Sequence, residues 1–278
     1  MNPVPRRDLF RTGLAAAAGA ATAGVAWGLY EAAWVRLEEL VVGLSGLAPE
    51  LAGLRIAHLS DFHLGVPSPG ARAVERAVDW VADRDPDLVL VTGDLLARPG
   101  GADRLRSLVE RLPPAYAVLG NHDYADSRDP FSRPVGEVDL GRGTLLSDSS
   151  VTLELRGLRV QLVGIDPRTY MRREARPWEL AEPDADLRIL LSHFPRIVDY
   201  LPERSFDLVL SGHMHDGQIC IPYGRGKVRI AHPRAPYNQG LYHRAGSVLH
   251  VSAGLGTTFV PFRFFARPEA TELVLESR

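Results

Sequence analysis

The chain has 278 residues, of which 45% are apolar and 24% charged, and its mean hydropathy of -0.07 is that of a globular protein. These values exclude disordered, collagen-like and multi-span membrane proteins. The formal net charge is -2, so the composition demands no basic patch and we expect no nucleic-acid partner. Cys220 is the only cysteine, which excludes an intrachain disulfide and a cysteine-based zinc site.

The N-terminus has the layout of a targeting signal. Arg6, Arg7 and Arg11 precede an uncharged, Ala-rich run over residues 12–30. The arginine pair resembles a twin-arginine signal, whose pathway exports folded proteins. If the run is not cleaved, about 19 residues are just long enough to span a bilayer and leave the rest of the chain outside. We predict that residues 1–30 are such a signal or a membrane anchor; the alternative is an ordinary helix of the fold.

The rest of the chain alternates apolar runs with amphipathic stretches. Residues 31–53 are either a connecting segment, an edge strand or a helix that emerges from the membrane. The pattern then predicts strands at 54–59, 88–91 and 116–119, with helices at 71–82 and 105–112. Further strands are predicted at 151–155, 158–165, 187–191, 206–210, 247–251 and 271–275. This order favours an α/β fold with mixed sheets and helices packed outside.

Polar residues of the kind that bind metals follow the predicted strands. They are Asp61 and His63, Asp94, Asn121 and His122, His193, and His213 and His215. In open α/β sheets the carboxyl ends of the strands border the ligand crevice, so these side chains are expected to converge. On extended backbone, residues i and i+2 point to the same side, which predicts that Asp61 with His63, and likewise His213 with His215, face one cavity.

The chemistry of these side chains favours transition metals. Imidazole combined with carboxylate suits manganese, iron, zinc or cobalt, whereas magnesium and calcium prefer oxygen alone. Seven of these side chains would be too many for one ion that keeps an open position, and they suit two ions that share a carboxylate. Two ions about 3.5–4 Å apart can clamp a phosphorus centre for in-line displacement. A single histidine at a strand end is more often structural, and we interpret His58, His232, His243 and His250, which lack metal-type partners, as structural or surface residues.

These residues also occur in a known order. The chain resembles the calcineurin-like metallophosphoesterases over about residues 52–276. The resemblance is carried by five blocks: Asp61-Phe62-His63, Gly93-Asp94, Gly120-Asn121-His122-Asp123, His193, and Gly212-His213-Met214-His215. Gly217-Gln218, Gly254-Leu255-Gly256-Thr257 and Pro261-Phe262-Arg263-Phe264-Phe265 are similar to a bacterial subgroup that carries an N-terminal signal or anchor.

The resemblance implies a four-layer αββα sandwich of two mixed sheets, formed by a domain at residues 54–278. It also implies two divalent transition-metal ions, with manganese, zinc and iron as candidates. By the family pattern the ligands fall into three sets: Asp61, His63 and His215 for one ion, Asn121, His193 and His213 for the other, and Asp94 as the bridge. A hydroxide between the metals would attack phosphorus while His122 binds a phosphoryl oxygen or protonates the leaving alkoxide. Asp123 would orient either His122 or Asn121.

Several functions remain open within this resemblance. The leading hypothesis is a phosphodiesterase of the cell envelope that acts on a phospholipid head group or a wall polymer. The alternatives are a UDP-2,3-diacylglucosamine pyrophosphatase of lipid A synthesis, a non-catalytic metal-binding interaction module, and a nuclease, which the near-neutral charge disfavours. The loop at 222–246 contains Tyr223, Arg225, Lys227 and Arg229, and it either contacts a phosphate or sugar or is a solvated surface hairpin.

Overall fold

The computed structural model describes the backbone of residues 6–278 and the side chains of residues 14–278. Its helices are α1 (Arg6–Ala33), α2 (Gly70–Arg84), α3 (Ala102–Glu110) and α4 (Pro167–Met171). Shorter 3-10 turns are η1 (Pro49–Leu51), η2 (Pro99–Gly101), η3 (Pro177–Glu179), η4 (Pro195–Asp199) and η5 (His215–Gly217). The two long helices that the sequence predicts in the body, α2 and α3, are therefore present with slightly shifted ends.

The strands form two six-stranded sheets and a separate hairpin. The first sheet has the order β1 (Arg36–Leu44), β14 (Glu269–Ser277), β2 (Arg55–Leu59), β3 (Leu88–Thr92), β4 (Ala115–Val118) and β5 (Thr144–Leu145). The second has the order β12 (Gly240–Arg244), β13 (Ser247–Val251), β9 (Leu208–Ser211), β8 (Leu187–Ser192), β7 (Leu158–Ile165) and β6 (Ser149–Leu155). The hairpin consists of β10 (Cys220–Tyr223) and β11 (Gly226–Arg229).

Both sheets are mixed, as expected. Strands β2 to β5 are parallel, while β14 runs antiparallel to β2 and parallel to β1. In the second sheet β7, β8, β9 and β13 are parallel, and the edge strands β6 and β12 are antiparallel. The parallel strands of each sheet therefore direct their carboxyl ends toward one edge, where the predicted ligands follow them.

Three apolar layers hold the sandwich together. Strand residues alternate between the two faces, so that Leu88 and Leu90 of β3 enter the core between the sheets while Val89 and Val91 pack under α2 and α3. The outer face of the second sheet is covered by η4 and by residues around η3. The predicted four layers are thus confirmed, but the layer over the second sheet consists of 3-10 turns and the short α4 instead of long helices.

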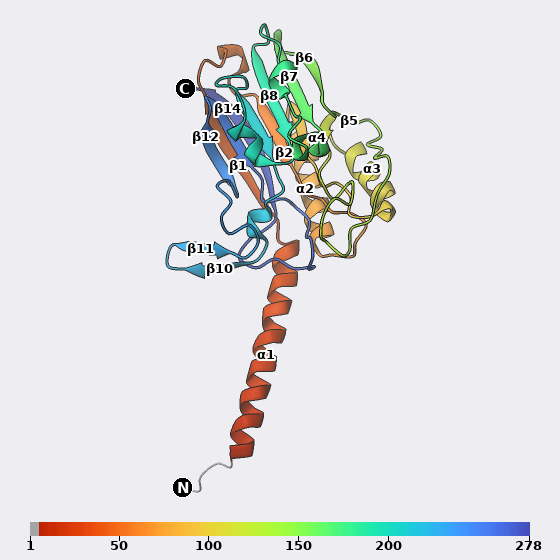
Figure 1. Ribbon diagram of the computed structural model, residues 1–278, viewed down its shortest axis with the longest axis vertical. Helices are drawn as coiled ribbons and strands as arrows, with labels where there is room; N and C mark the ends of the chain where they lie inside the picture. Colours follow the sequence, from red (N-terminus) through yellow and green to blue (C-terminus); the bar gives the residue numbers. More distant parts are fainter. Residues whose placement is uncertain (1–5) are drawn as a thin grey trace.

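The N-terminal helix α1 runs away from the body (Figure 1). It is followed by β1 at the edge of the first sheet, which pairs with β14 from Arg36 opposite Glu269 to Leu44 opposite Ser277. No helix in the part of the chain that the structure describes combines the length and the hydropathy that crossing a membrane requires. The side chains of Arg6, Arg7 and Arg11 lie outside the described residues, so the signal or anchor at 1–30 stays a prediction.

Candidate metal centre

The predicted ligands meet where the two sheets end. The loops after β2, β3 and β4 supply Asp61, His63, Asp94 and Asn121, and the loops after β8 and β9 supply His193, His213 and His215. Backbone hydrogen bonds hold the first two loops side by side, because the amide of Asp61 donates to the Gly93 carbonyl and that of His63 donates to the Asp94 carbonyl, both at 2.9 Å. Residues far apart in the chain are therefore fixed around one point.

The backbone at the ligands is left-handed, which corrects the expectation of extended i and i+2 pairs. Asp61, His63, Asp94, His213 and His215 have φ angles between 48° and 71°. Positive φ is strained for residues with a Cβ, and such strain is found where surrounding structure fixes a functional side chain. The side chains of each pair do converge, but they converge because the chain turns sharply at each ligand. Phe62, between the two ligands of the first pair, packs into the core.

The ligand atoms form two groups that meet near Asp94. One group contains Asp61, His63 and His215, and another contains Asp94, His193 and His213. In the first, Nε2 of His215 lies 3.2 Å from Oδ1 of Asp61 and 3.0 Å from Nε2 of His63. In the second, Nε2 of His193 lies 3.2 Å from Oδ2 of Asp94, and His63 is 3.6 Å from that same oxygen. The family resemblance predicts the first group as the ligands of one ion, His193 and His213 with Asn121 as ligands of the other, and Asp94 as the bridge.

The donors fit divalent cations. Asn121 donates its Nδ2 hydrogen to the Asp126 carbonyl, while its buried Oδ1 has no hydrogen-bond partner among the described residues. The Nε2 atoms of His63 and His215 face each other beside two carboxylates in a buried space. A cation satisfies such converging lone pairs, and nitrogen with oxygen donors suits transition metals. Clustered Asp and His side chains of this kind form a divalent metal centre.

Neighbouring groups fix the orientation of individual ligands. His193 places Nδ1 at 2.8 Å from the Thr92 carbonyl, which leaves Nε2 directed at Asp94. The His122 amide donates to Oδ1 of Asp94 at 2.8 Å, and the His213 amide donates to the Asp61 carboxylate. Such hydrogen bonds set the tautomer and aim of metal-binding side chains.

Burial and charge together shift the pKa values in the centre. Burial would raise the pKa of Asp94, but His193 and His122 outweigh it and hold that pKa well below its usual range. Burial would lower the pKa of His193, but the Asp94 carboxylate raises it to about 9. Burial, with a contribution from His122, lowers the pKa of His63 to about 3. The carboxylates are thus kept ionised and His63 is kept neutral, whereas His193 would have to release a proton to an incoming ion.

His122 lies beside both groups with its Nδ1 side occupied. Ser132 Oγ lies 2.6 Å from Nδ1, and the Asp129 carboxylate is 4.0 Å away. His122 also belongs to a third potential ligand group with His63 and Asp94, so its predicted role outside the ligand set remains to be tested. No sequence pattern indicated a role for Ser132 or Asp129, which lie in the loop between β4 and β5.

Asp123 does not orient His122 or Asn121, contrary to one expectation. Its carboxylate accepts the backbone amides of Gly120, Leu95 and Leu96 at 2.8–3.3 Å. It therefore ties the loop after β4 to the loop after β3. Burial and the charge of Asp94 raise the pKa of Asp123 to about 7.

Arg263 contacts a predicted ligand, which the sequence pattern did not indicate. It is fully buried, and its guanidinium donates to the carbonyls of Ala253, Gly254, Gly256 and Ala266. Its Nη2 also lies 3.1 Å from Nδ1 of His215. A charged residue within the apolar run Val260–Phe265 was the available signal, because a buried arginine requires such partners.

Two histidines that we interpreted as structural or surface residues prove to be buried together. Nδ1 of His58 lies 2.7 Å from Nδ1 of His250, and Nε2 of His58 lies 2.9 Å from the Thr92 hydroxyl. Burial, with Arg36 contributing, lowers the pKa of His250 to about 3, and burial holds the pKa of His58 well below its usual value. His232 and His243 are exposed, and Cys220 is buried.

A cavity of about 640 Å³ opens beside His213. The ring of Phe194 lies against His213, with centroids 4.6 Å apart, and stacks on Tyr170 at 4.8 Å. Arg196 and Arg234 are the charged side chains of the lining, which contains no carboxylate. The cavity therefore joins the metal centre to an aromatic wall and a positively charged rim.

Comparison with known proteins identifies the family. The model of the calcineurin-like phosphoesterase family matches residues 54–217, and the chain belongs to this family. It is 30% identical to the metallophosphoesterase YkoQ of Bacillus subtilis over 230 residues, which cover 80% of this chain and 84% of the relative. The identity is 26% to the metallophosphoesterase YkuE of the same organism, over 100% and 99% of the two chains. It is also 26% to the phosphodiesterase YaeI of Escherichia coli, over 81% and 83%. The chain is thus a metallophosphoesterase, an enzyme that hydrolyses phosphoesters.

Proposed function

We propose that the chain is a two-metal phosphodiesterase of the cell envelope. The observation that carries the proposal is the meeting of two ligand groups at Asp94, next to a cavity with room for a second ester arm. YaeI, a relative of similar length, is a phosphodiesterase by name, which supports a diester as the substrate.

The seven predicted ligands would hold the two ions in the sets described above, with manganese, zinc and iron as candidates. When bound, such ions supply positive charge for the phosphoryl oxygens and lower the pKa of water to the neutral range. His63, His193, His213 and His215 would contribute nitrogens, with His193 losing its proton when an ion binds, and Asp61 and Asp94 would contribute the negative charge that retains the ions. Loss of water from the buried site strengthens these interactions.

His122 would move the proton that the leaving group needs. With Ser132 and Asp129 on its Nδ1 side, Nε2 is the nitrogen left to face the ester. The leaving arm would then lie toward His122, while the retained arm would occupy the cavity lined by Phe194 and Tyr170. A lipid head group or a wall polymer carries a diester of this kind.

The metal count and the substrate class can be measured on the full chain. Elemental analysis should find close to two transition-metal ions, and Asp94→Asn should disturb both because its carboxylate is shared. Diesters should be cleaved faster than monoesters in the presence of manganese. One ion at every loading would refute the two-metal centre, and a preference for monoesters would refute the diesterase.

The proposed location depends on the arginine pair. Export or anchoring would place the metal domain outside the cytoplasmic membrane. Replacing Arg6 and Arg7 by lysine should keep the protein in the cytoplasm, because the export receptor reads the arginines. Fractionation that finds the variant exported as before would show that a different route or a plain anchor operates.

A further inference from the structure

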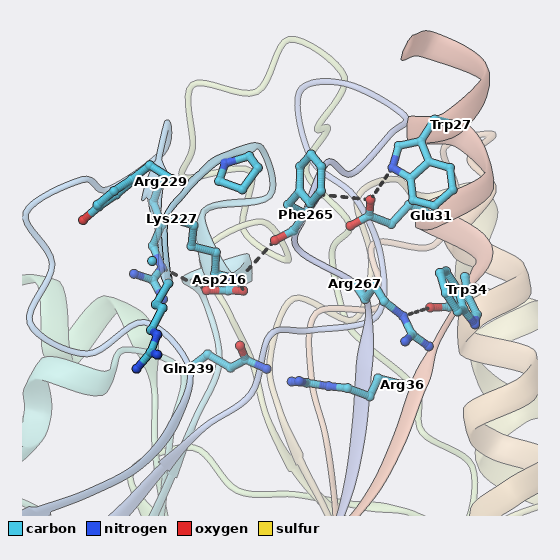
Figure 2. Close-up of a pocket in the computed structure, with 14 residues that line it drawn as sticks. Trp27, Glu31, Trp34, Arg36, Asp216, Lys227, Arg229, Gln239, Phe265 and Arg267 are labelled. Atoms are coloured by element: carbon cyan, nitrogen blue, oxygen red, sulfur yellow. Dashed lines mark hydrogen bonds and ion pairs between the residues drawn. The ribbon is translucent and has the colours of Figure 1, made fainter. Parts of the chain in front are cut away.

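A second large cavity, separate from the one beside His213, lies where α1 meets the body. Its volume is about 770 Å³, and its walls come from the end of α1, the β10–β11 hairpin and the segment 265–267. Figure 2 shows Trp27 of α1 and Trp34, which directly follows this helix, on one side and Lys227 and Arg229 of the hairpin on the other. None of these residues belongs to the ligand groups or to the cavity beside His213.

The lining of this cavity carries more positive than negative side chains. Five cationic side chains line it against two carboxylates; the cations are Arg36, which also pairs with Glu38 and Glu269 outside the lining, and Arg225, Lys227, Arg229 and Arg267. The carboxylates are already engaged within the protein. Glu31 accepts the amides of Phe265 and Ala266 and the indole hydrogen of Trp27, and Asp216 pairs with Lys227 and Arg229. The cavity is therefore complementary to an anion.

The hairpin has an exposed apolar face. Ile221 lies directly opposite Val228 across the two strands, and Tyr223 and Ile230 follow at the next positions on that face. These four side chains are 47–63% exposed. Lys227 and Arg229 alternate with them and point to the opposite face, toward Asp216. An isolated two-stranded hairpin whose apolar face is uncovered has the pattern of an element that enters an apolar environment.

Aromatic residues at the end of α1 and directly after it lie on the other side of this cavity. Trp27, Tyr30 and Trp34 pack on one another with ring centroids 5.6–6.4 Å apart, and each remains 39–57% exposed. The Arg267 guanidinium lies over the Trp34 ring, 3.8 Å from its centroid. Tryptophan and tyrosine gather at membrane–water interfaces, where their rings are apolar on one side and polar on the other.

Figure 1 shows the hairpin projecting from the body beside the base of α1. We infer that the hairpin, the aromatic end of α1 and the segment 265–267 form a surface that binds bilayers containing anionic phospholipids. The apolar face of the hairpin enters the boundary between head groups and acyl chains, and the basic cavity receives phosphate head groups. This inference rests on the membrane association proposed above and adds the lipid chemistry and the residues.

Hydrogen bonds and adjacent residues connect this surface to the metal centre. The Arg263 amide donates to the Gly28 carbonyl of α1 at 3.1 Å, and the Arg263 side chain contacts His215. Asp216, which lines the basic cavity, directly follows His215. Docking on this surface therefore holds the metal centre close to the lipid head groups, where a membrane-resident phosphodiester is found.

The test is flotation of the metal-loaded full chain with vesicles of phosphatidylcholine alone or mixed with phosphatidylglycerol. The wild type should bind the anionic vesicles at least tenfold more tightly. Arg225→Gln should lose about fivefold on anionic vesicles only, since one basic side chain near the surface contributes about that factor. Ile221→Thr with Val228→Thr, which keeps strand-forming residues, should weaken binding to both vesicle types.

A matched control lies on α4 and its end. Met171→Thr with Arg172→Gln changes one exposed apolar and one exposed basic residue there and should bind like the wild type. Circular dichroism, metal content and hydrolysis of a soluble diester are measured on every sample. Hairpin variants should match the wild type in all three measurements. A loss of vesicle binding would therefore not contradict the proposed hydrolase activity. Absence of hydrolysis in the wild type would likewise not change how vesicle binding is interpreted.

Three outcomes would overturn the inference. Hairpin variants that float like the wild type would show that the surface does not bind lipid. Soluble glycerol 3-phosphate that displaces the protein from vesicles at the same concentration as the lipid phosphate would make the cavity a site for small phosphate esters. Sedimentation that shows a wild-type dimer and a monomeric Ile221→Thr/Val228→Thr variant, with vesicle binding unchanged, would assign the surface to a second copy of the chain.

Discussion

The side chains of Arg263 and His215 are in contact at the metal centre, with Nη2 of the arginine 3.1 Å from Nδ1 of the histidine. The other donors of the guanidinium are used by four backbone carbonyls of the segment 253–266. Burial lowers the pKa of Arg263 to about 10, which leaves it charged at neutral pH. One side chain therefore anchors both the C-terminal loop and a predicted ligand.

Arg263→Lys should damage both the fold and the metal centre. A lysine keeps the charge but cannot reach all the carbonyls, and buried carbonyls without donors are costly. We expect a loss of about 1–3 kcal/mol in the free energy of unfolding and weaker metal retention against a chelator. Arg159→Lys, at an exposed position of β7, is the control. If metal retention is unchanged while stability falls, Arg263 supports the loop alone.

Gly120→Ala tests how tightly the loop after β4 approaches Asp94. A Cβ at position 120 would lie 2.1 Å from Oδ1 of Asp94, so the carboxylate must move. We expect a loss of about 1–3 kcal/mol in stability and at least one metal ion fewer in elemental analysis. Gly100→Ala is the control, because a Cβ there meets no atom within 4 Å. Full metal content in the Gly120 variant would contradict the role of Asp94 as the shared ligand.

His122→Ala separates proton transfer from metal binding. If His122 protonates the leaving group, the loss should be about 10²–10⁴-fold on an alkyl diester and much smaller on a p-nitrophenyl ester, which leaves without a proton. Metal content should stay near that of the wild type. Equal losses on both esters would assign His122 to holding the phosphoryl group, and a fall in metal content would make it a ligand.

Phe194→Ala tests the cavity beside His213. The ring stacks on Tyr170 and forms the wall nearest the metal centre. We expect KM to rise about tenfold for a diester whose retained arm is aromatic, since loss of one stacking contact is worth about 1 kcal/mol or more. KM for a methyl-substituted diester should change little. Phe131→Ala, an exposed residue elsewhere, is the control.

The buried His58 and His250 pair predicts sensitivity to acid. The folded-state pKa of His250, about 3, lies below the unfolded value of 6.5, so the unfolded chain binds more protons at acidic pH. The stability of the metal-free protein should therefore be complete above pH 6.5 and decline as the pH falls toward 3. His250→Gln should reduce the slope by about one proton, roughly 1.4 kcal/mol per pH unit. Urea titrations between pH 7 and 4.5 measure it, with exposed His243→Gln as the control. An unchanged slope would show that His250 binds its proton equally in the folded and unfolded states, so that burial does not lower its pKa.

The sequence predicted the sheets and the eight polar residues at the strand ends because both depend on local patterns. Leu88 to Val91 is a strand by its composition, and Asp94 follows it at the edge that parallel strands share. The left-handed backbone at Asp61 and His63 was missed, since it arises from contacts with the neighbouring loop rather than from either residue. Ser132 and Arg263 were missed for a similar reason. Their roles depend on loops whose course is set only by the folded body.

The pairing of β1 with β14 makes the first strand of the body depend on the last one synthesised. Residues 36–44 can enter the sheet only after residues 269–277 have left the ribosome. Until then the N-terminal helix is connected to a body whose first sheet is incomplete. Removal of the segment before residue 54 would also remove β1 and leave β14 as an uncovered edge strand. A strand exposed in that way invites pairing with other chains. Soluble expression of the metallophosphoesterase body should therefore require a start before Arg36.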